Sequence, residues 1–243
     1  MEAMRSEYES MKSFNVFTEM ELSQVPKEQQ AEIIDSRWVH RRKPDGTVRS
    51  RLVCRGFKEI IEKDEAYAAT PTFSTFKMIL SHALNSNHAM YFGDISTAFL
   101  HADVLQPIFA KPPKGYQKDS KQPKVWQLHK AMCGLKSAPR SWQTHITAVL
   151  QGIGLQQMKS DSCLFRDSGS EVFVIVYVDD LFITGVTKEK VQDVISGIAK
   201  QVLLKEVGWL SMGGKVSYLG REINHLGNAI SIGVNSRYIQ RMV

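Results

Sequence analysis

The stretch Val-Phe-Val-Ile-Val-Tyr-Val-Asp-Asp-Leu-Phe-Ile-Thr, residues 172–184, is the most strongly patterned part of this 243-residue chain. Residues 172–178 are nearly all β-branched or aromatic, as in a buried strand, and residues 181–184 resume that pattern after Asp179 and Asp180. Two apolar runs separated by turn residues are typical of a β-hairpin. We therefore predict a hairpin that carries two adjacent acids at its turn.

These two acids have more than one interpretation. Aspartate is a favoured turn residue, so Asp179 and Asp180 alone would fit an ordinary turn. The flanking strands favour a functional role, because two like charges at the edge of a deeply buried hairpin cost free energy. A bound divalent cation would offset their repulsion.

Asp94 supplies a third carboxylate at the end of a short apolar strand predicted over residues 90–95. A lone aspartate at a strand end is often a helix cap. Three oxygen donors that converge from two strands, however, suit Mg²⁺, which takes few protein carboxylates and keeps waters. Two such ions about 4 Å apart would activate a primer 3′-hydroxyl and stabilise the departing pyrophosphate. Asp94, Asp179 and Asp180 are therefore the candidate catalytic residues.

The rest of the chain mixes helical and hairpin patterns. Apolar residues at helical spacing predict helices near residues 4–11, 76–84, 139–150 and 191–202. Further hairpins are predicted around Asp45-Gly46 and around Gly227-Asn228. Because helices and strands do not alternate strictly, we predict an α+β fold in which helices back an antiparallel sheet.

Composition excludes several classes of protein. The apolar fraction of 43% is that of a globular protein, and no apolar run approaches the roughly 20 residues that cross a bilayer. A charged, polar N-terminal segment argues against a signal peptide. Three widely spaced cysteines, Cys54, Cys133 and Cys163, form neither a disulfide framework nor a zinc motif. We expect an intracellular protein that is not secreted and has no membrane partner.

The net charge of +6 is unevenly distributed. Residues 37–58 carry eight basic side chains against the single acid Asp45, whereas residues 1–36 carry eight acids against three bases. A basic block on a hairpin suits a phosphate-rich partner. A solvated cationic surface is an equally good interpretation of this segment alone.

Taken together, these segments resemble the reverse transcriptase domain of copia-type retrotransposons, part of a retrovirus-related Pol polyprotein. A single Tyr-x-Asp-Asp motif is weak support, but an ordered set of segments is strong. In family order, the segments that carry the resemblance are residues 34–39, 49–57, 94–103, 134–142, 177–180 and 218–220. Departures include Cys133 in place of an aromatic residue and an unfamiliar sequence at residues 210–214.

The resemblance implies the fingers and palm of a right-hand polymerase, with an antiparallel palm sheet backed by helices and the thumb largely absent. The implied ranges are an N-terminal and fingers part at residues 1–89, palm at 90–110, fingers at 111–140, and palm with the start of the thumb at 141–243. A last helix is expected to begin near residues 237–239. The chain is expected to be a fragment of a longer polyprotein or a truncated element copy.

The resemblance also implies roles for the acids. Asp94 and Asp179 would bind two Mg²⁺ or Mn²⁺ ions directly, Asp180 would contribute, and the carbonyl of Ile95 would be a further oxygen donor.

Nucleotide binding is implied for Arg49, Arg51, Phe99 and Lys136. The arginines would hold the triphosphate, since the guanidinium fork binds phosphate oxygens in a bidentate manner. Phe99 would crowd a ribose 2′-hydroxyl and so favour deoxynucleotides. The alternatives are a salt-bridged surface strand for the arginines and a core aromatic for Phe99.

Template–primer contacts are implied for Gly134, Tyr177, Tyr218 and Gly220. Gly134 would let the backbone approach nucleic acid closely, and a plain turn glycine is the alternative.

The implied activity is RNA-directed DNA polymerisation. Its partners would be an RNA template, a DNA or RNA primer and deoxynucleoside triphosphates, with integrase and ribonuclease H domains in the full polyprotein. Two alternatives stay open, an inactive nucleic-acid-binding remnant and a metal-dependent nuclease. The expected location is the cytoplasm, including virus-like particles, or the nucleus.

Overall fold

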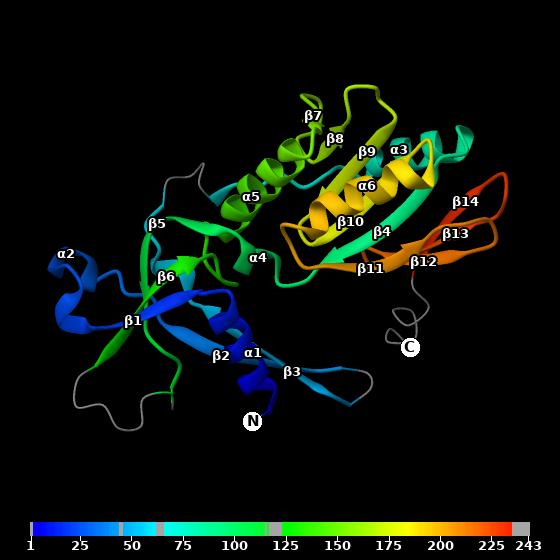
Figure 1. Cartoon of the computed structure of the whole chain (residues 1–243). Coiled ribbons are helices and arrows are strands. Elements are labelled where there is room, and N and C mark those ends of the chain that lie inside the picture. Colours follow the sequence, from blue (N-terminus) through cyan, green and yellow to red (C-terminus); the bar gives the residue numbers. More distant parts are fainter. Residues whose placement is uncertain (1, 44–45, 62–65, 115, 117–122, 235–243) are drawn as a thin grey trace. The chain divides into compact units, whose positions relative to one another are not determined.

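The computed structural model describes residues 2–43, 46–61, 66–114, 116 and 123–234. They form two units, each made from two separate segments of the chain (Figure 1). Unit 1 comprises residues 1–68 and 99–145, and unit 2 comprises residues 69–98 and 146–243. Asp45 and the helix predicted near residues 237–239 lie outside the described residues, and the ranges predicted for fingers, palm and thumb stay predictions.

Unit 1 is built around two small antiparallel sheets. The first has the strand order β1-β6-β5 and the second pairs β2 with β3. Its elements are α1 (Glu2–Ser13), β1 (Phe17–Glu21), α2 (Lys27–Gln30), β2 (Ser36–Arg42), β3 (Val48–Cys54), the 3₁₀ turn η2 (Gly56–Lys58), β5 (Asp103–Ala110) and β6 (Lys124–Lys130). Two helices, α4 (Ala98–His101) and α5 (Ala138–Gly152), cross the boundaries between the units.

Unit 2 contains a six-stranded antiparallel sheet with the order β11-β4-β10-β9-β8-β7 and a separate three-stranded sheet, β12-β13-β14. The strands of the large sheet are β4 (Ala89–Ile95), β7 (Gln156–Gln157), β8 (Leu164–Arg166), β9 (Val172–Tyr177), β10 (Asp180–Gly185) and β11 (Leu204–Trp209). The remaining elements are α3 (Phe73–Asn85), α6 (Lys188–Ala199), β12 (Lys215–Tyr218), β13 (Arg221–His225) and β14 (Ile230–Val234). Helices combined with antiparallel sheets confirm the predicted α+β class.

The hairpin predicted from residues 172–184 is confirmed as β9 and β10, which pair from Val172↔Gly185 to Tyr177↔Asp180. Its apolar side chains form the core of unit 2. Phe182 of β10 stacks on Phe92 of β4 with 4.8 Å between ring centroids, and Phe76 of α3 meets Phe182 edge-on at 5.5 Å. Aromatic contacts of this kind stabilise a core beyond simple burial. They therefore hold β10, and with it the turn between β9 and β10, in a fixed position.

None of the described helices is long and apolar enough to span a membrane.

Candidate functional site

The turn between β9 and β10 is tight and strained. Tyr177 and Asp180 pair directly, which leaves Val178 and Asp179 as the two turn residues. Val178 has a φ of +55°, in the left-handed region that β-branched residues rarely adopt. Such a conformation costs about 1–3 kcal/mol and persists only where the surrounding structure enforces it. The strong pairing of β9 with β10 therefore fixes the position of both acids.

Asp94 lies next to this turn. It is the residue of β4 directly opposite Asp180 of β10. Directly opposite residues in antiparallel strands have Cβ atoms about 4.5–5.5 Å apart and project from the same face of the sheet. The amide of Ile95 also donates a hydrogen bond of 2.7 Å to the carbonyl of Asp179. The predicted grouping of Asp94, Asp179 and Asp180 at one end of the sheet is thus present.

These acids repel one another. Burial, and after it the negative charges of Asp179 and Asp94, together raise the pKa of Asp180 to about 6. A nearby cation would favour the ionised form, because it offsets both the desolvation and the repulsion. The electrostatics of this end of the sheet therefore suit a divalent cation.

Among the described residues, no three His, Cys, Asp or Glu side chains are arranged so that they alone would hold a metal ion. Mg²⁺ is usually bound through one or two carboxylates, with water and substrate phosphates completing the coordination. The facing pair of Asp94 and Asp180 provides that donor chemistry. Metal binding by Asp94, Ile95, Asp179 and Asp180 stays a prediction.

The raised pKa of Asp180 predicts how stability varies with pH. In the metal-free protein the pKa lies above the ordinary 3.8, so the folded state binds the proton more tightly than the unfolded state. The free energy of unfolding should fall by about 1–2 kcal/mol as pH rises from 4 to 6.5, after allowance for solvent screening. Urea titrations across this range measure the fall, and Asp180→Asn should remove it. An equal fall in Asp180→Asn would assign the effect to another group.

Tyr177, Tyr218 and Gly220 lie in unit 2, but with different surroundings. Tyr177 is half-buried at the end of β9. Tyr218 is only 3% exposed and packs against Phe76 and Phe92, so the structure gives it a core role. Gly220 has a φ of +71° in the β12–β13 turn, which explains the glycine by turn geometry. Their contacts with a template or primer stay predictions.

Phe99 and the two arginines lie in unit 1. Phe99 is half-buried in α4, five residues after Asp94 in the sequence. Arg49 and Arg51 lie on β3, opposite Arg41 and Val39 of β2. Arg49 is exposed, whereas Arg51 is half-buried and donates from Nη1 to the sulfur of Cys133 at 3.7 Å.

Gly134 lies very close to the backbone of β3 in the same unit. A Cβ atom at this position would lie 2.1 Å from the carbonyl oxygen of Cys54 and 2.6 Å from Cγ1 of Val53. Its φ of +91° also favours glycine. Contact with β3 therefore accounts for this glycine, and close approach to nucleic acid stays a prediction.

Comparison with known proteins identifies the family of this chain. The profile of the reverse transcriptase (RNA-dependent DNA polymerase) family matches residues 17–243. The chain belongs to the reverse transcriptase family.

Several relatives of this reverse transcriptase-family chain are retrotransposon polyproteins. It is 29% identical to the retrovirus-related Pol polyprotein from transposon TNT 1-94 of Nicotiana tabacum, over 86% of this chain and 16% of that protein. The Pol polyprotein from transposon RE2 of Arabidopsis thaliana is 27% identical over 72% of the chain and 13% of that protein. The Ty1-DR5 Gag-Pol polyprotein of Saccharomyces cerevisiae is 26% identical over 86% of the chain and 12% of that protein. The chain thus spans less than a fifth of these relatives.

A solved structure of a foamy viral protease–reverse transcriptase in complex with double-stranded DNA is also similar to the chain. The sequence identity is 14%, the TM-score is 0.44, and the match covers 86% of this chain and 32% of that one.

Two features of unit 1 were not predicted from sequence. The first is the packing of α1 against β3, which brings Glu7 near Arg51 and Arg49, although the helix itself was predicted. Burial raises the pKa of Glu7, while the two arginines oppose that rise. The predicted triphosphate-binding arginines therefore have an acidic neighbour that precedes the family-matched residues.

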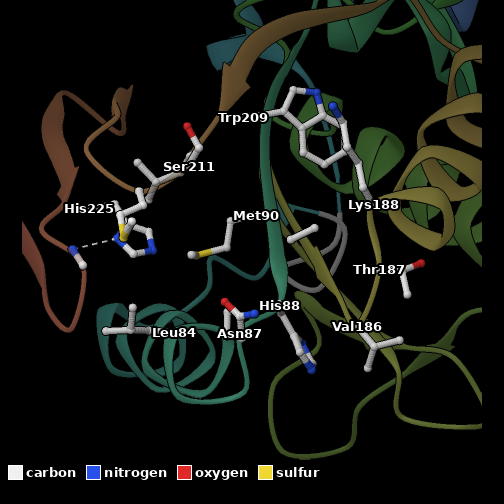
Figure 2. Close-up of a pocket in the computed structure, with 15 residues that line it drawn as sticks. Leu84, Asn87, His88, Met90, Val186, Thr187, Lys188, Trp209, Ser211 and His225 are labelled. Carbon is white, nitrogen blue, oxygen red and sulfur yellow. Dashed lines mark hydrogen bonds between the residues drawn. The ribbon is translucent and has the colours of Figure 1, made fainter.

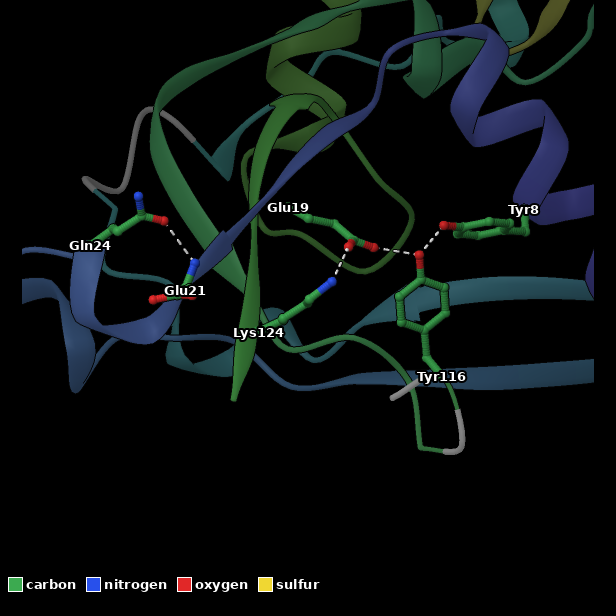
Figure 3. A network of polar contacts seen from close by, with 6 residues as sticks. All are labelled: Tyr8, Glu19, Glu21, Gln24, Tyr116 and Lys124. Atoms are coloured by element: carbon green, nitrogen blue, oxygen red, sulfur yellow. Dashed lines mark hydrogen bonds and ion pairs between the residues drawn. The ribbon is translucent and has the colours of Figure 1, made fainter. Parts of the chain in front are cut away.

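A network of polar and aromatic contacts holds α1 in place (Figure 3). Tyr8 of α1 hydrogen-bonds to the hydroxyl of Tyr116, which donates to Glu19 of β1. Lys124 of β6 pairs with Glu19 at 3.2 Å. The ring of Tyr8 also lies 6.4 Å from buried Trp126. These contacts join α1 to the β1-β6-β5 sheet.

The second unpredicted feature is Glu59, just after η2. Its carboxylate is buried and accepts hydrogen bonds from the backbone and side chain of residues 136–137. No spacing or neighbouring motif distinguishes Glu59 in the sequence, because its partners lie 77 and 78 residues away.

A cavity of about 430 Å³ lies in unit 2 beside the start of β4 and the connection from β10 to α6 (Figure 2). Lys188 lies over the ring of Trp209 there, 4.8 Å from its centroid, and Nδ1 of His225 accepts from the amide of Gly227 at 3.1 Å. No aspartate or glutamate is among the described residues that line it. Since Ala89 begins β4 and Asp94 lies near its end, this cavity is separate from the candidate catalytic acids.

Proposed function

We propose that this chain is the polymerase core of a retrotransposon reverse transcriptase, which adds deoxynucleotides to a primer 3′-hydroxyl on an RNA template. The observation that carries the proposal is the direct opposition of Asp94 and Asp180, with Asp179 held beside them by its bond to Ile95. Membership of the reverse transcriptase family supports the same activity. An intracellular location, with integrase and ribonuclease H domains in a longer polyprotein, belongs to the same proposal.

Asp94, Asp179 and Asp180 would hold two Mg²⁺ or Mn²⁺ ions. When bound, these ions would activate the attacking hydroxyl and neutralise charge on the leaving pyrophosphate. Phosphoryl transfer depends mainly on positioning and charge stabilisation, so no protein nucleophile is required. The rigid β9–β10 hairpin supplies the positioning, since its strained turn leaves the acids little freedom.

The test is primer extension on a polyriboadenylate template with an oligodeoxythymidylate primer, dTTP and either Mg²⁺ or Mn²⁺. Extension of the primer supports the polymerase. Binding of the template–primer without extension under either metal would instead favour an inactive remnant, and loss of template without use of dTTP would favour a nuclease.

Arg49 and Arg51 would bind the triphosphate. Changing both to alanine should raise the KM for dTTP by about tenfold or more, because each bidentate charge-assisted contact contributes on the order of 1.5–3 kcal/mol. Steady-state primer extension measures KM, with Arg41→Ala as a control on the neighbouring strand. If only the salt-sensitive affinity for the duplex changes, the arginines contact the nucleic-acid backbone instead.

Phe99 would exclude ribonucleotides. Phe99→Ala should increase the ratio of ribonucleotide to deoxynucleotide incorporation by about tenfold or more, since removing the ring frees space for a 2′-hydroxyl. Competition between UTP and dTTP in single-nucleotide extension measures the ratio. Unchanged sugar selection in an active variant would assign Phe99 to the core.

A further inference from the structure

Glu59 is a buried carboxylate in unit 1 that the proposed chemistry does not use. Glu59 is only 5% exposed to solvent. Oε2 accepts hydrogen bonds from the amides of Lys136 and Ser137, the latter at 3.4 Å, and Oε1 accepts from the hydroxyl of Ser137. A buried carboxylate is costly unless such donors surround it. Glu59 and residues 136–137 therefore stabilise one another.

Lys136 adds a second link between the same segments. Its ammonium donates to the carbonyls of Phe57, at 3.1 Å, and Glu59, at 2.9 Å. The ammonium group of Lys136 is thus already engaged by backbone oxygens of the segment that follows β3.

Backbone hydrogen bonds extend the contact toward β3. The amide of Cys54 donates to the carbonyl of Cys133 at 2.9 Å, and the amide of Gly56 donates to the carbonyl of Gly134 at 3.1 Å. Residues 54–59 and 133–137 are therefore joined along their whole length. At one end these bonds hold the glycine that abuts β3, and at the other Glu59 holds the start of α5.

We propose that Glu59 is a positioning residue, which holds the backbone of residues 134–137 in the shape that binds the template–primer. Glu59 and Lys136 together form a clamp that joins residues 57–59 to residues 136–137. Lys136 is therefore a part of this clamp and not a ligand of the triphosphate. The inference rests on the proposed polymerase function and on the template–primer contact that the resemblance implies for Gly134. Two oxygens of one carboxylate satisfy two amides and a hydroxyl, which no single neutral side chain of this length reproduces.

The hydrogen bonds of the clamp predict which variants should weaken it most. Glu59→Gln keeps one acceptor oxygen, and its amide can donate to the hydroxyl of Ser137, so it should retain part of the clamp. Glu59→Ala keeps none of it. Glu32→Ala, at an exposed glutamate of the same unit, is the matched control.

Hydrogen exchange in the full chain, without substrate, tests the clamp directly. The amides of Lys136 and Ser137 should exchange about tenfold faster or more in Glu59→Ala, by a smaller factor in Glu59→Gln, and at the unaltered rate in Glu32→Ala. If Glu59→Ala folds and the exchange rates of these two amides stay within about twofold of those in the unaltered chain, the inference is overturned. If Glu59→Ala fails to fold, Glu59→Gln supplies the same comparison, and unaltered exchange there would also overturn it.

Kinetics then separate positioning from triphosphate binding. Glu59→Ala should raise the Kd for the template–primer by about tenfold and change kcat by less than about threefold. Lys136→Met should raise the same Kd, and the double variant should be little worse than Glu59→Ala alone, because the two residues act as one unit. A higher KM for dTTP in Lys136→Met with unchanged exchange, and effects that multiply in the double variant, would overturn the role given to Lys136.

The two proposals fail in different ways. If the unaltered chain never extends a primer, the proposed function fails, while exchange and template–primer binding still report on Glu59. If the chain extends primers and Glu59→Ala matches it in Kd and exchange, only the positioning role fails.

Discussion

Replacing Asp179 with asparagine is expected to lower the rate of nucleotide incorporation by about 1,000-fold or more, since the ions proposed to stabilise the transferring phosphoryl group would lose a charged ligand. Asparagine has the size of aspartate and is also a favoured turn residue, so the β9–β10 hairpin should keep its geometry. The loss should therefore appear in catalysis and not in folding. Asp94→Asn should behave in the same way, because Asp94 faces the same end of the hairpin.

The measurement is single-turnover extension by one nucleotide with saturating dTTP and Mg²⁺, alongside the melting temperature of each variant. Asp193→Asn is the matched control, since Asp193 is an exposed aspartate on α6 in the same unit. An Asp179→Asn protein that kept more than about a tenth of the rate would contradict its assignment as a metal ligand. A large drop in melting temperature would show that the acid serves the turn instead.

Gly134→Ala is expected to destabilise unit 1 by about 3 kcal/mol or more. The left-handed backbone conformation costs an alanine about 1–2 kcal/mol, and overpacking against a neighbouring segment typically costs another 1–3 kcal/mol. The clash cannot be relieved by rotating a side chain, because the nearest atom is the backbone oxygen of Cys54 at 2.1 Å. Either β3 or the segment of residues 133–137 would have to move.

Urea unfolding monitored by tryptophan fluorescence measures this loss. Gly46→Ala is a matched control in the same unit, because Gly46 has a similar φ of +83° but no atom of the described residues within 4 Å of an added Cβ. It should lose only the conformational part, about 1 kcal/mol. Equal losses in the two variants would show that the contact with β3 does not matter, and that only the backbone conformation selects glycine.

Template affinity gives Gly134→Ala a second readout. If β3 alone explains the glycine, variants that remain folded should lose template–primer affinity only in proportion to their loss of structure. A folded variant with unchanged hydrogen exchange at residues 135–137 but weak template binding would support the predicted close approach of nucleic acid.

Local sequence patterns determined much of this fold. The run of β-branched and aromatic residues was enough to predict the β9–β10 hairpin, because strand pairing across a two-residue turn is a local property. The predicted turn was one residue off, since Val178 and Asp179 form it and Asp180 already pairs with Tyr177 in β10. The spacing of Val191, Ile195 and Ile198 likewise predicted the buried face of α6, since residues three and four apart share one side of a helix. The order of the motifs, through resemblance, supplied the polymerase hypothesis and its three acids.

Long-range pairing was decided only by the tertiary structure. Asp94 comes to face Asp180 because β4 pairs with β10 in one particular register, and a shift by one residue would turn Asp94 to the other face of the sheet. Glu59 meets Ser137 and Gly134 meets Cys54 for the same kind of reason, since these contacts join segments about 80 residues apart and leave no periodic trace in the sequence. The spacing of residues along the chain shows which side chains lie on the same face of one helix or strand. Which other helix or strand packs against that face depends on how all the elements pack together.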